Sequence, residues 1–384
     1  MRARNRERWR SCIVSRCITI EHGSQHTSVA AQVAAVTETS HGGGRCAFAK
    51  LMSSNENRNG YRRWLLRVAA VASVCLAGAV STVQADAPLG VYEGAGCDGR
   101  DALPAFEAWL GRRPDRVLDF MTWSTMVAND PWSMKCWKSA GIKSITYSLP
   151  MLPENGSATL AEGASGKFDH VFANFANTLV ANGYPNAVIR IGWEFNGDWY
   201  SWAASKDPQS WIAYWRRIVT AMRAAPGSNF KFDWCPGNGW TAFRAEDAYP
   251  GDAYVDIIGL DEYNATWNAN ANTPALRWKE QVEQRHGLKW HADFAAAHGK
   301  PMSFPEWGTG TRQDGHGSGD DPMFIEQMAE WIATHNVAYH NYWDYDHYHF
   351  SGRISDNGQP LAAAAFLKKF RLPRPKAPVL SSVR

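Results

Sequence analysis

Residues 187–197 have the sequence AVIRIGWEFNG, a short apolar run that ends in a carboxylate. A run of this length, rich in β-branched residues, predicts a buried strand. Similar runs occur at residues 89–94, 116–123, 144–149, 230–235, 255–261, 302–306 and 338–343. Longer amphipathic stretches lie between them and predict helices at residues 168–182, 208–225, 275–298 and 322–336. This alternation predicts an α/β fold, a single-domain TIM (β/α)8 barrel at residues 88–372.

The composition narrows the class of ligand. The chain of 384 residues has 40 Lys and Arg against 37 Asp and Glu, and the region with the strand pattern contains no basic block. We therefore expect no nucleic-acid partner. The 19 Trp, 13 Tyr and 16 Phe provide more aromatic surface than a core of this size usually needs. Sugar rings, which present apolar C–H faces, are one class of ligand that would use this surface.

The N-terminal part of the chain differs from the rest. Residues 1–60 lack sustained apolar periodicity and are expected to be disordered or a mis-assigned upstream extension. Residues 61–87 have the organisation of an export signal, with Arg62 and Arg63 before an apolar run at residues 68–80 and small residues near Ala85. That run would span about 20 Å as a helix, which is too short for a retained membrane anchor. We expect a secreted or periplasmic protein, with a twin-arginine route as one alternative, and a flexible tail at residues 373–384.

Three of the seven Cys follow the predicted signal, namely Cys97, Cys136 and Cys235. In an exported protein, Cys97 and Cys136 are the expected disulfide, and Cys235 is expected to be a buried thiol. No two of the three have the C-x-x-C spacing of a zinc site, and His347 and His349 lack a convincing third ligand in sequence. We therefore expect no metal and no cofactor.

Two glutamates occupy matching positions at predicted strand ends, where a barrel places its reactive groups. Glu194 ends the fourth run and Glu306 ends the seventh, and aromatic residues bracket both. Partial desolvation favours the protonated form that a general acid needs, so Glu194 is the candidate acid/base and Glu306 the candidate nucleophile. Strand alternation places Arg190 and Gly192 on the same face as Glu194, so Arg190 would hold a carboxylate ionised from beneath. Two structural salt bridges are the alternative interpretation, which explains the matching positions less well.

Three segments resemble glycoside hydrolase family 26, the β-mannanase family within the clan A TIM-barrel glycosidases. They are residues 190–202 (RIGWEFNGDWYSW), 249–263 (YPGDAYVDIIGLDEY) and 300–308 (KPMSFPEWG). The resemblance covers most of residues 88–372. It implies that Glu194 is the acid/base and Glu306 the nucleophile, that Tyr263 is a hydrogen-bond partner of the nucleophile, and that Trp343 is a platform under the sugar at the cleavage point.

One position departs from the family, which usually has His immediately before its acid/base. This chain has Trp193 there, and an indole can only donate a hydrogen bond and cannot titrate. The departure leaves the two-carboxylate chemistry intact and widens the expected substrate from β-mannan to a related plant or bacterial glycan. The residues expected to contact substrate are Arg190, Trp193, Asn196, Trp199, Trp202, Tyr263, Trp307 and Trp343.

The function expected from the sequence is a secreted, retaining endo-β-glycanase that acts as a monomer on a polysaccharide or oligosaccharide. A transglycosylase would use the same residues, and a non-catalytic glycan-binding protein on a decayed barrel is a further alternative. An esterase or protease of the serine type is disfavoured, because no G-x-S-x-G elbow or ordered Ser/His/Asp set occurs in the sequence.

Overall fold

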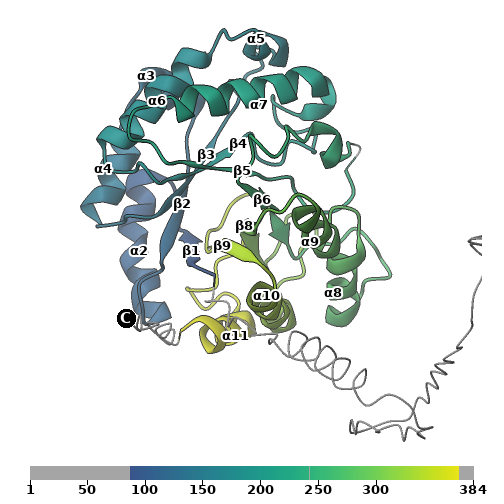
Figure 1. Cartoon of the computed structure of the whole chain (residues 1–384). Helices are drawn as coiled ribbons and strands as arrows, with labels where there is room; N and C mark the ends of the chain where they lie inside the picture. Colours follow the sequence, from purple (N-terminus) through teal and green to yellow (C-terminus); the bar gives the residue numbers. More distant parts are fainter. Residues whose placement is uncertain (1–86, 242, 372–384) are drawn as a thin grey trace, which may run out of the picture. The chain divides into compact units, whose positions relative to one another are not determined.

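Parallel strand pairing closes a barrel in the computed structural model, which describes residues 87–241 and 243–371 (Figure 1). The strands pair in the order β6-β5-β4-β3-β2-β1-β9-β8, and β6 also pairs with β8, which closes the ring. The two-residue β7 follows β6 in the chain and pairs with β8 as well. The bounds are β1 Leu89–Tyr92, β2 Arg116–Phe120, β3 Ile145–Leu149, β4 Val188–Ile191, β5 Lys231–Trp234, β6 Ile257–Gly259, β7 Glu262–Tyr263, β8 Met302–Gly308 and β9 Val337–Trp343. The prediction of a TIM barrel is confirmed.

Helices surround the strands, as Figure 1 shows. Their bounds are α2 Gly96–Leu110, α3 Trp123–Ala128, α4 Trp132–Ser139, α5 Leu160–Ala164, α6 Asp169–Ala181, η1 Ala204–Lys206, α7 Pro208–Arg223, η2 Ala245–Ala248, α8 Pro274–Glu283, α9 Leu288–Ala297, α10 Pro322–Thr334 and α11 Pro360–Phe370. The single helix predicted at residues 275–298 is wrong, because the chain forms α8 and α9 there. His286 interrupts it with a φ of 53°, and its buried ring accepts a hydrogen bond from the backbone of Ala245.

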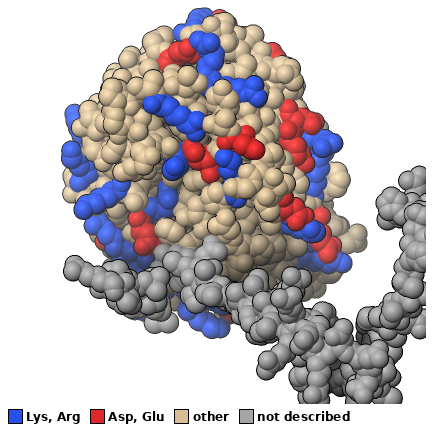
Figure 2. All heavy atoms as spheres, viewed as in Figure 1, with Lys and Arg blue, Asp and Glu red and all other residues tan. Residues whose placement is uncertain are grey.

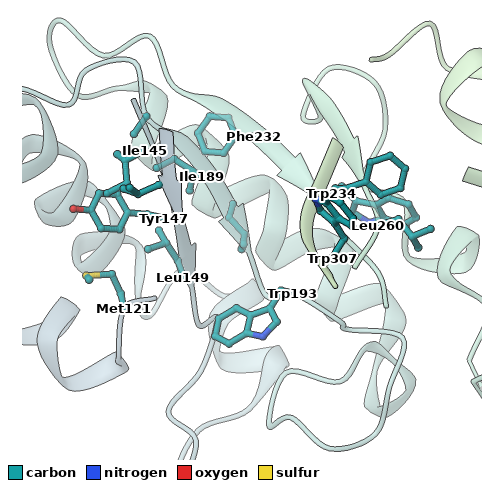
Figure 3. Close-up of a cluster of buried hydrophobic side chains, with 14 of the residues drawn as sticks. Met121, Ile145, Tyr147, Leu149, Ile189, Trp193, Phe232, Trp234, Leu260 and Trp307 are labelled. Atoms are coloured by element: carbon teal, nitrogen blue, oxygen red, sulfur yellow. The ribbon is translucent and has the colours of Figure 1, made fainter. Parts of the chain in front are cut away.

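Alternation along the strands separates an apolar outer layer from a polar interior. Ile145, Tyr147 and Leu149 on β3 lie in one apolar cluster with Ile189 on β4, as Figure 3 shows. Burying an aliphatic side chain of this size contributes roughly 1.5–3 kcal/mol to stability. Arg190, which lies between Ile189 and Ile191 on β4, is also fully buried. Its guanidinium donates to Asp261, which lies between β6 and β7, and to Glu306 on β8. The interior beneath the strand ends is therefore built from charged groups that balance one another.

The predicted disulfide between Cys97 and Cys136 is present and joins α2 to α4, with 5.0 Å between the two Cα atoms. Cys235 is buried and unpaired, as predicted. Burial raises the pKa of the Cys235 thiol well above its ordinary value, so the thiol is inert.

Removing this crosslink is expected to destabilise the barrel. The two cysteines are 39 residues apart in sequence, and closing a loop of that length stabilises a fold by about 3–4 kcal/mol in the chain-entropy model. Cys97→Ser should lower the free energy of unfolding in urea by about that amount. Cys235→Ser is the matched control for loss of a thiol without a crosslink. Equal urea midpoints for parent and Cys97→Ser would contradict the prediction.

Charged side chains of both signs are interspersed on the face of the molecule shown in Figure 2, with broad uncharged areas between them. Within the described ranges, no helix combines the length and the apolar character needed to cross a bilayer. The predicted upstream extension at residues 1–60, nearly all of the predicted signal at residues 61–87 and the predicted tail at residues 373–384 lie outside the described residues.

Candidate active site

The backbone turns sharply at the end of β4 and carries Glu194 into a cleft. β4 ends at Ile191, and both Gly192 and Glu194 have left-handed conformations, with φ of 53° and 51°. Such a conformation is uncommon for a residue other than glycine and is typical of functional sites. Because the strand ends there, the predicted alternation stops at Ile191. Trp193, which alternation would place on the outer face, lines the cleft instead.

The position of Glu194 is fixed by three contacts. Its backbone N–H donates to the carbonyl of Cys235 over 2.9 Å. The indole N–H of Trp199 donates to its Oε2 over 3.1 Å. Gly237 lies against the side chain, and a Cβ at that position would come within 3.3 Å of Oε1. Burial and the negative charge of Glu306 raise the pKa of Glu194 to about 7, although Arg190 and Trp199 oppose the rise. Glu194 therefore holds a proton up to neutral pH.

Glu306 reaches the same cleft because β8 contains an irregularity. Phe304 pairs with His340 and Trp307 with Tyr342, so β8 has one residue more than β9 between these pairs. The extra residue lets Phe304 and Trp307 both pack outside the barrel, against His291 and Phe366, while Glu306 points inward. Bulges commonly re-aim side chains next to active sites.

Two donors hold the Glu306 carboxylate. An Nη of Arg190 donates to Oε1, and the Tyr263 hydroxyl donates to Oε2 over 2.6 Å. Arg190 is fully buried and also donates to Asp261 Oδ1 over 2.8 Å. Burial raises the pKa of Asp261 well above its ordinary value, although Arg190 opposes the rise. Charge-assisted bonds of this kind favour the ionised form of the accepting carboxylate.

The cleft around the two carboxylates has a volume of about 820 Å³ and largely aromatic walls. Trp343 stacks on Tyr92 with ring centroids 4.4 Å apart, and the indole of Trp193 donates to the Tyr200 hydroxyl over 2.9 Å. Arg312 and Asn238 add polar groups to the wall. Aromatic faces with a few polar groups suit the apolar face and hydroxyl rim of a sugar.

Most of the residues predicted from the sequence meet in this cleft. They are Trp193, Glu194, Trp199, Tyr263, Glu306 and Trp343. Arg190, also predicted to contact substrate, does not line the cleft, because it is fully buried behind Glu306. It does lie where the alternation predicted, beneath the carboxylates.

Three of the residues predicted to contact substrate do not line the cleft. Trp202 is fully buried, stacks on Tyr200 and donates to the carbonyl of Trp193. Trp307 is fully buried on the outer face and donates to His340. The Asn196 amide is buried and bonds both the N–H and the carbonyl of Gly237. These side chains support the site from behind the cleft.

Sequence reasoning missed several residues of the wall. Tyr92 ends β1 and Phe120 ends β2, so the rule that selected the two glutamates would also have found them. Tyr200, Arg312 and Phe350 lie on long loops after strands, where no periodicity places a side chain. Among the described residues, no group of three or more His, Cys, Asp or Glu has a metal-binding arrangement, and His347 and His349 lie in the cleft wall.

Comparison with known proteins relates part of the chain to one family. The model of Glycosyl hydrolase family 26 matches residues 162–300. The chain is 27% identical over 274 residues to endoglucanase H of Acetivibrio thermocellus, which is 68% of this chain and 28% of that protein. It is 30% identical over 165 residues to a mannan endo-1,4-β-mannosidase of Bifidobacterium adolescentis, which is 41% of this chain and 16% of that protein. The matched region is thus a minor part of each curated relative.

Solved structures share the fold. GH26C from Muricauda sp. has a TM-score of 0.54 at 17% identity, over 76% of this chain and 87% of that one. A modular endo-β-1,4-mannanase from Cellulomonas fimi has a TM-score of 0.52 at 19% identity, over 73% of this chain and 71% of that one. Structural similarity to proteins of such low sequence identity is evidence for the fold alone.

Proposed function

The chain belongs to glycoside hydrolase family 26, and from this premise we propose that it is a retaining, endo-acting β-glycanase whose first candidate substrate is β-1,4-mannan. One observation carries the proposal. Two carboxyl groups in different environments, Glu194 and Glu306, lie in one aromatic cleft at the ends of β4 and β8. Carboxyl groups whose environments differ in this way suit the two catalytic roles of a glycosidase, and the retaining course is proposed from the family resemblance.

In the first step, Glu306 Oε2 or Oε1 attacks the anomeric carbon while Glu194 gives its proton to the oxygen of the departing sugar. The glycosidic bond breaks, a covalent glycosyl-enzyme ester forms on Glu306, and Glu194 becomes a carboxylate. In the second step, Glu194 takes a proton from water, and the hydroxide attacks the anomeric carbon from the opposite side of the ester. The ester bond breaks, and both carboxyl groups regain their starting forms. Arg190 and Tyr263 hold Glu306 in place during both steps.

The substrate is tested by a panel of purified mannan, glucan, xylan and bacterial exopolysaccharides, with release of reducing sugar as the readout. Mannan is tested first because one of the similar proteins is a mannan endo-1,4-β-mannosidase. Glucan is tested second because another is an endoglucanase. A rapid fall in viscosity relative to reducing-sugar release indicates endo action. Binding without release on every polysaccharide would favour the non-catalytic alternative. Export from the cell stays a prediction, since the signal lies outside the described residues.

The role of Glu194 predicts a specific pH dependence. Its pKa of about 7 means that the acid form is present below neutral pH and is lost as pH rises. The kcat/KM for polysaccharide should therefore fall about tenfold per pH unit above about pH 7. Glu194→Ala should lower polysaccharide cleavage by about 10²–10⁴-fold and remove this decline. It should keep a larger share of activity on a 4-nitrophenyl glycoside, whose leaving group needs no proton.

Glu246→Ala provides a matched control, because Glu246 lies on η2 and does not line the cleft. It should keep the parent pH profile. A Glu194→Ala enzyme that retains the alkaline decline, or that loses activity on both substrates equally, would contradict the assignment of Glu194 as the acid.

A further inference from the structure

The chain between β5 and η2, called the β5 loop below, covers one side of Glu194. Glu194 donates its backbone N–H to the carbonyl of Cys235, the first residue of this loop. Two residues further on, Gly237 lies against the Glu194 side chain and lines the cleft. A covering of this kind keeps water from a carboxyl group, and the loss of water favours the protonated form.

Two consecutive residues between α8 and α9 hold the β5 loop. Arg285 donates from Nη1 to the carbonyl of Thr241 over 3.1 Å. His286 Nε2 accepts from the backbone N–H of Ala245, the first residue of η2, over 3.2 Å. Neither Arg285 nor His286 lines the cleft. The loop that forms one wall of the cleft is therefore fastened to the chain between two outer helices.

Asn196 connects His286 to the acid/base. Its amide donates to the carbonyl of Gly237 over 2.8 Å and accepts from the N–H of Gly237 over 2.9 Å. The nitrogen of the same amide lies 3.5 Å from His286 Nδ1. The His286 ring thus packs against the side chain that fixes Gly237, and Gly237 in turn contacts Glu194.

His286 is a costly residue for which the proposed mechanism has no use. Its φ of 53° is left-handed, a conformation that persists in residues other than glycine where the surrounding structure imposes it. Its ring is fully buried, and burial lowers the pKa of His286, although Glu246 opposes the fall. The neutral ring can accept from Ala245. Glu246 lies 3.4 Å from Nε2 but accepts from Trp290, so the bond to Ala245 does not depend on Glu246.

We propose that His286 is a positioning residue for the acid/base, and that it acts by holding the β5 loop against Glu194. The nucleophile is held separately, by Arg190 of β4 and Tyr263 of β7. Loss of the His286 contacts should therefore disturb Glu194 and leave Glu306 in place. The role of Glu194 as the acid rests on the proposed function, whereas its titration does not.

Titration of Glu194 is the direct test. Its ¹³Cδ signal is followed with pH in protein labelled with ¹³C-glutamate and is assigned by its absence in Glu194→Gln. The midpoint in the parent is expected at about 7. His286→Leu lacks the acceptor, so water should reach the carboxyl group and lower the midpoint by about one pH unit. In His286→Gln the amide oxygen can replace Nε2, and the midpoint should stay within about 0.2 unit of the parent.

Both His286 variants retain the other titratable and charged groups that act on Glu194 or His286, so a shift reports on the loop. These groups are Arg190, Tyr200, Glu246, Asp261, Tyr263, Arg285, Glu306 and Arg312. His291→Leu is the matched control, because His291 is a fully buried histidine of α9 that bonds the carbonyl of Ile258 and does not line the cleft. It should lower stability without moving the Glu194 midpoint.

Arg285→Met removes the other fastening of the loop and keeps the test informative if His286→Leu does not fold. It should lower the midpoint of Glu194 by about 0.5 unit. Loss of a cation would by itself raise that midpoint, so a fall reports on the loop and not on the charge.

Kinetics separate positioning from a general loss of structure. In His286→Leu, kcat/KM for the polysaccharide should fall about tenfold at pH 8 and less than about twofold at pH 5, because the acid form is lost at lower pH. The value for a 4-nitrophenyl glycoside should stay within about twofold of the parent at both pH values. Equal losses on the two substrates at both pH values would overturn the proposal.

The titration also separates this proposal from the proposed function. A lower midpoint in His286→Leu or Arg285→Met supports the positioning role even if the parent hydrolyses no glycan in the panel. A midpoint that neither variant lowers overturns that role even if the parent is an active glycanase.

Discussion

Replacing Glu306 by alanine is expected to abolish cleavage of every substrate that the parent hydrolyses. The glycosyl-enzyme ester forms on this carboxylate whatever the leaving group is, so a good leaving group gives no rescue. Losses on the order of 10⁴-fold or more in kcat are expected on both polysaccharide and aryl glycoside. Added azide should restore cleavage of the aryl glycoside and yield an α-glycosyl azide, because azide takes the place of the missing carboxylate.

The complementary experiment uses Glu194→Ala. There the ester on Glu306 still forms, so azide should attack it and yield the β-glycosyl azide. Glu283→Ala is the control, since Glu283 lies on α8 with a largely exposed side chain that pairs with Lys279. If both active-site variants keep parental activity, the two carboxylates are wrongly assigned. If the stereochemistry of the two azides is exchanged, the residues are right and their roles are reversed.

The sequence was sufficient to predict the barrel because strands buried on both sides appear as short apolar runs. The four helices predicted from amphipathic stretches correspond to α6, α7 and α10 and, merged into one, to α8 and α9. Other helices were not predicted, because their sequences lack the usual helical signals. α2 contains Gly96, Gly99 and Pro104, which normally interrupt helices. α3 and α5 have six and five residues, too few to display a helical period.

The predicted alternation of inward and outward side chains does not hold at the ends of β4 and β8, where Glu194 and Glu306 lie. Left-handed residues at Gly192 and Glu194 end β4, and an extra residue shifts β8 between Phe304 and Trp307. Gly192 and Pro305 interrupt the two runs, but neither residue shows in which direction the neighbouring side chains turn. Position at a strand end was therefore enough to select Glu194 and Glu306, but it could not show that Trp202 and Trp307 face away from the cleft.

Substitution of Arg190 by methionine is expected to cause a large loss of stability as well as activity. Arg190 is the buried cation between Asp261 and Glu306; it donates to Asp261 Oδ1, and Asp261 Oδ2 makes no hydrogen bond among the described residues. Methionine fills a similar volume but leaves two buried carboxyl groups without their cation. Removing one partner of a buried ion pair typically costs about 3–5 kcal/mol, and the free energy of unfolding in urea at pH 7 should fall by that amount.

The matched control is Arg223→Met, because Arg223 pairs with Asp256 over 3.2 Å at the surface with 40% of its side chain exposed. That change should cost less than about 1 kcal/mol. Asp261→Asn in the Arg190→Met background should recover part of the loss, because it removes one of the two unopposed charges. Arg190 opposes the rise in the pKa of Asp261, so its removal raises that pKa further. Protonation then neutralises the group as pH falls, and the penalty of Arg190→Met should shrink toward acid pH. A penalty equal to that of Arg223→Met, or one that grows toward acid pH, would show that Arg190 does not balance these carboxylates.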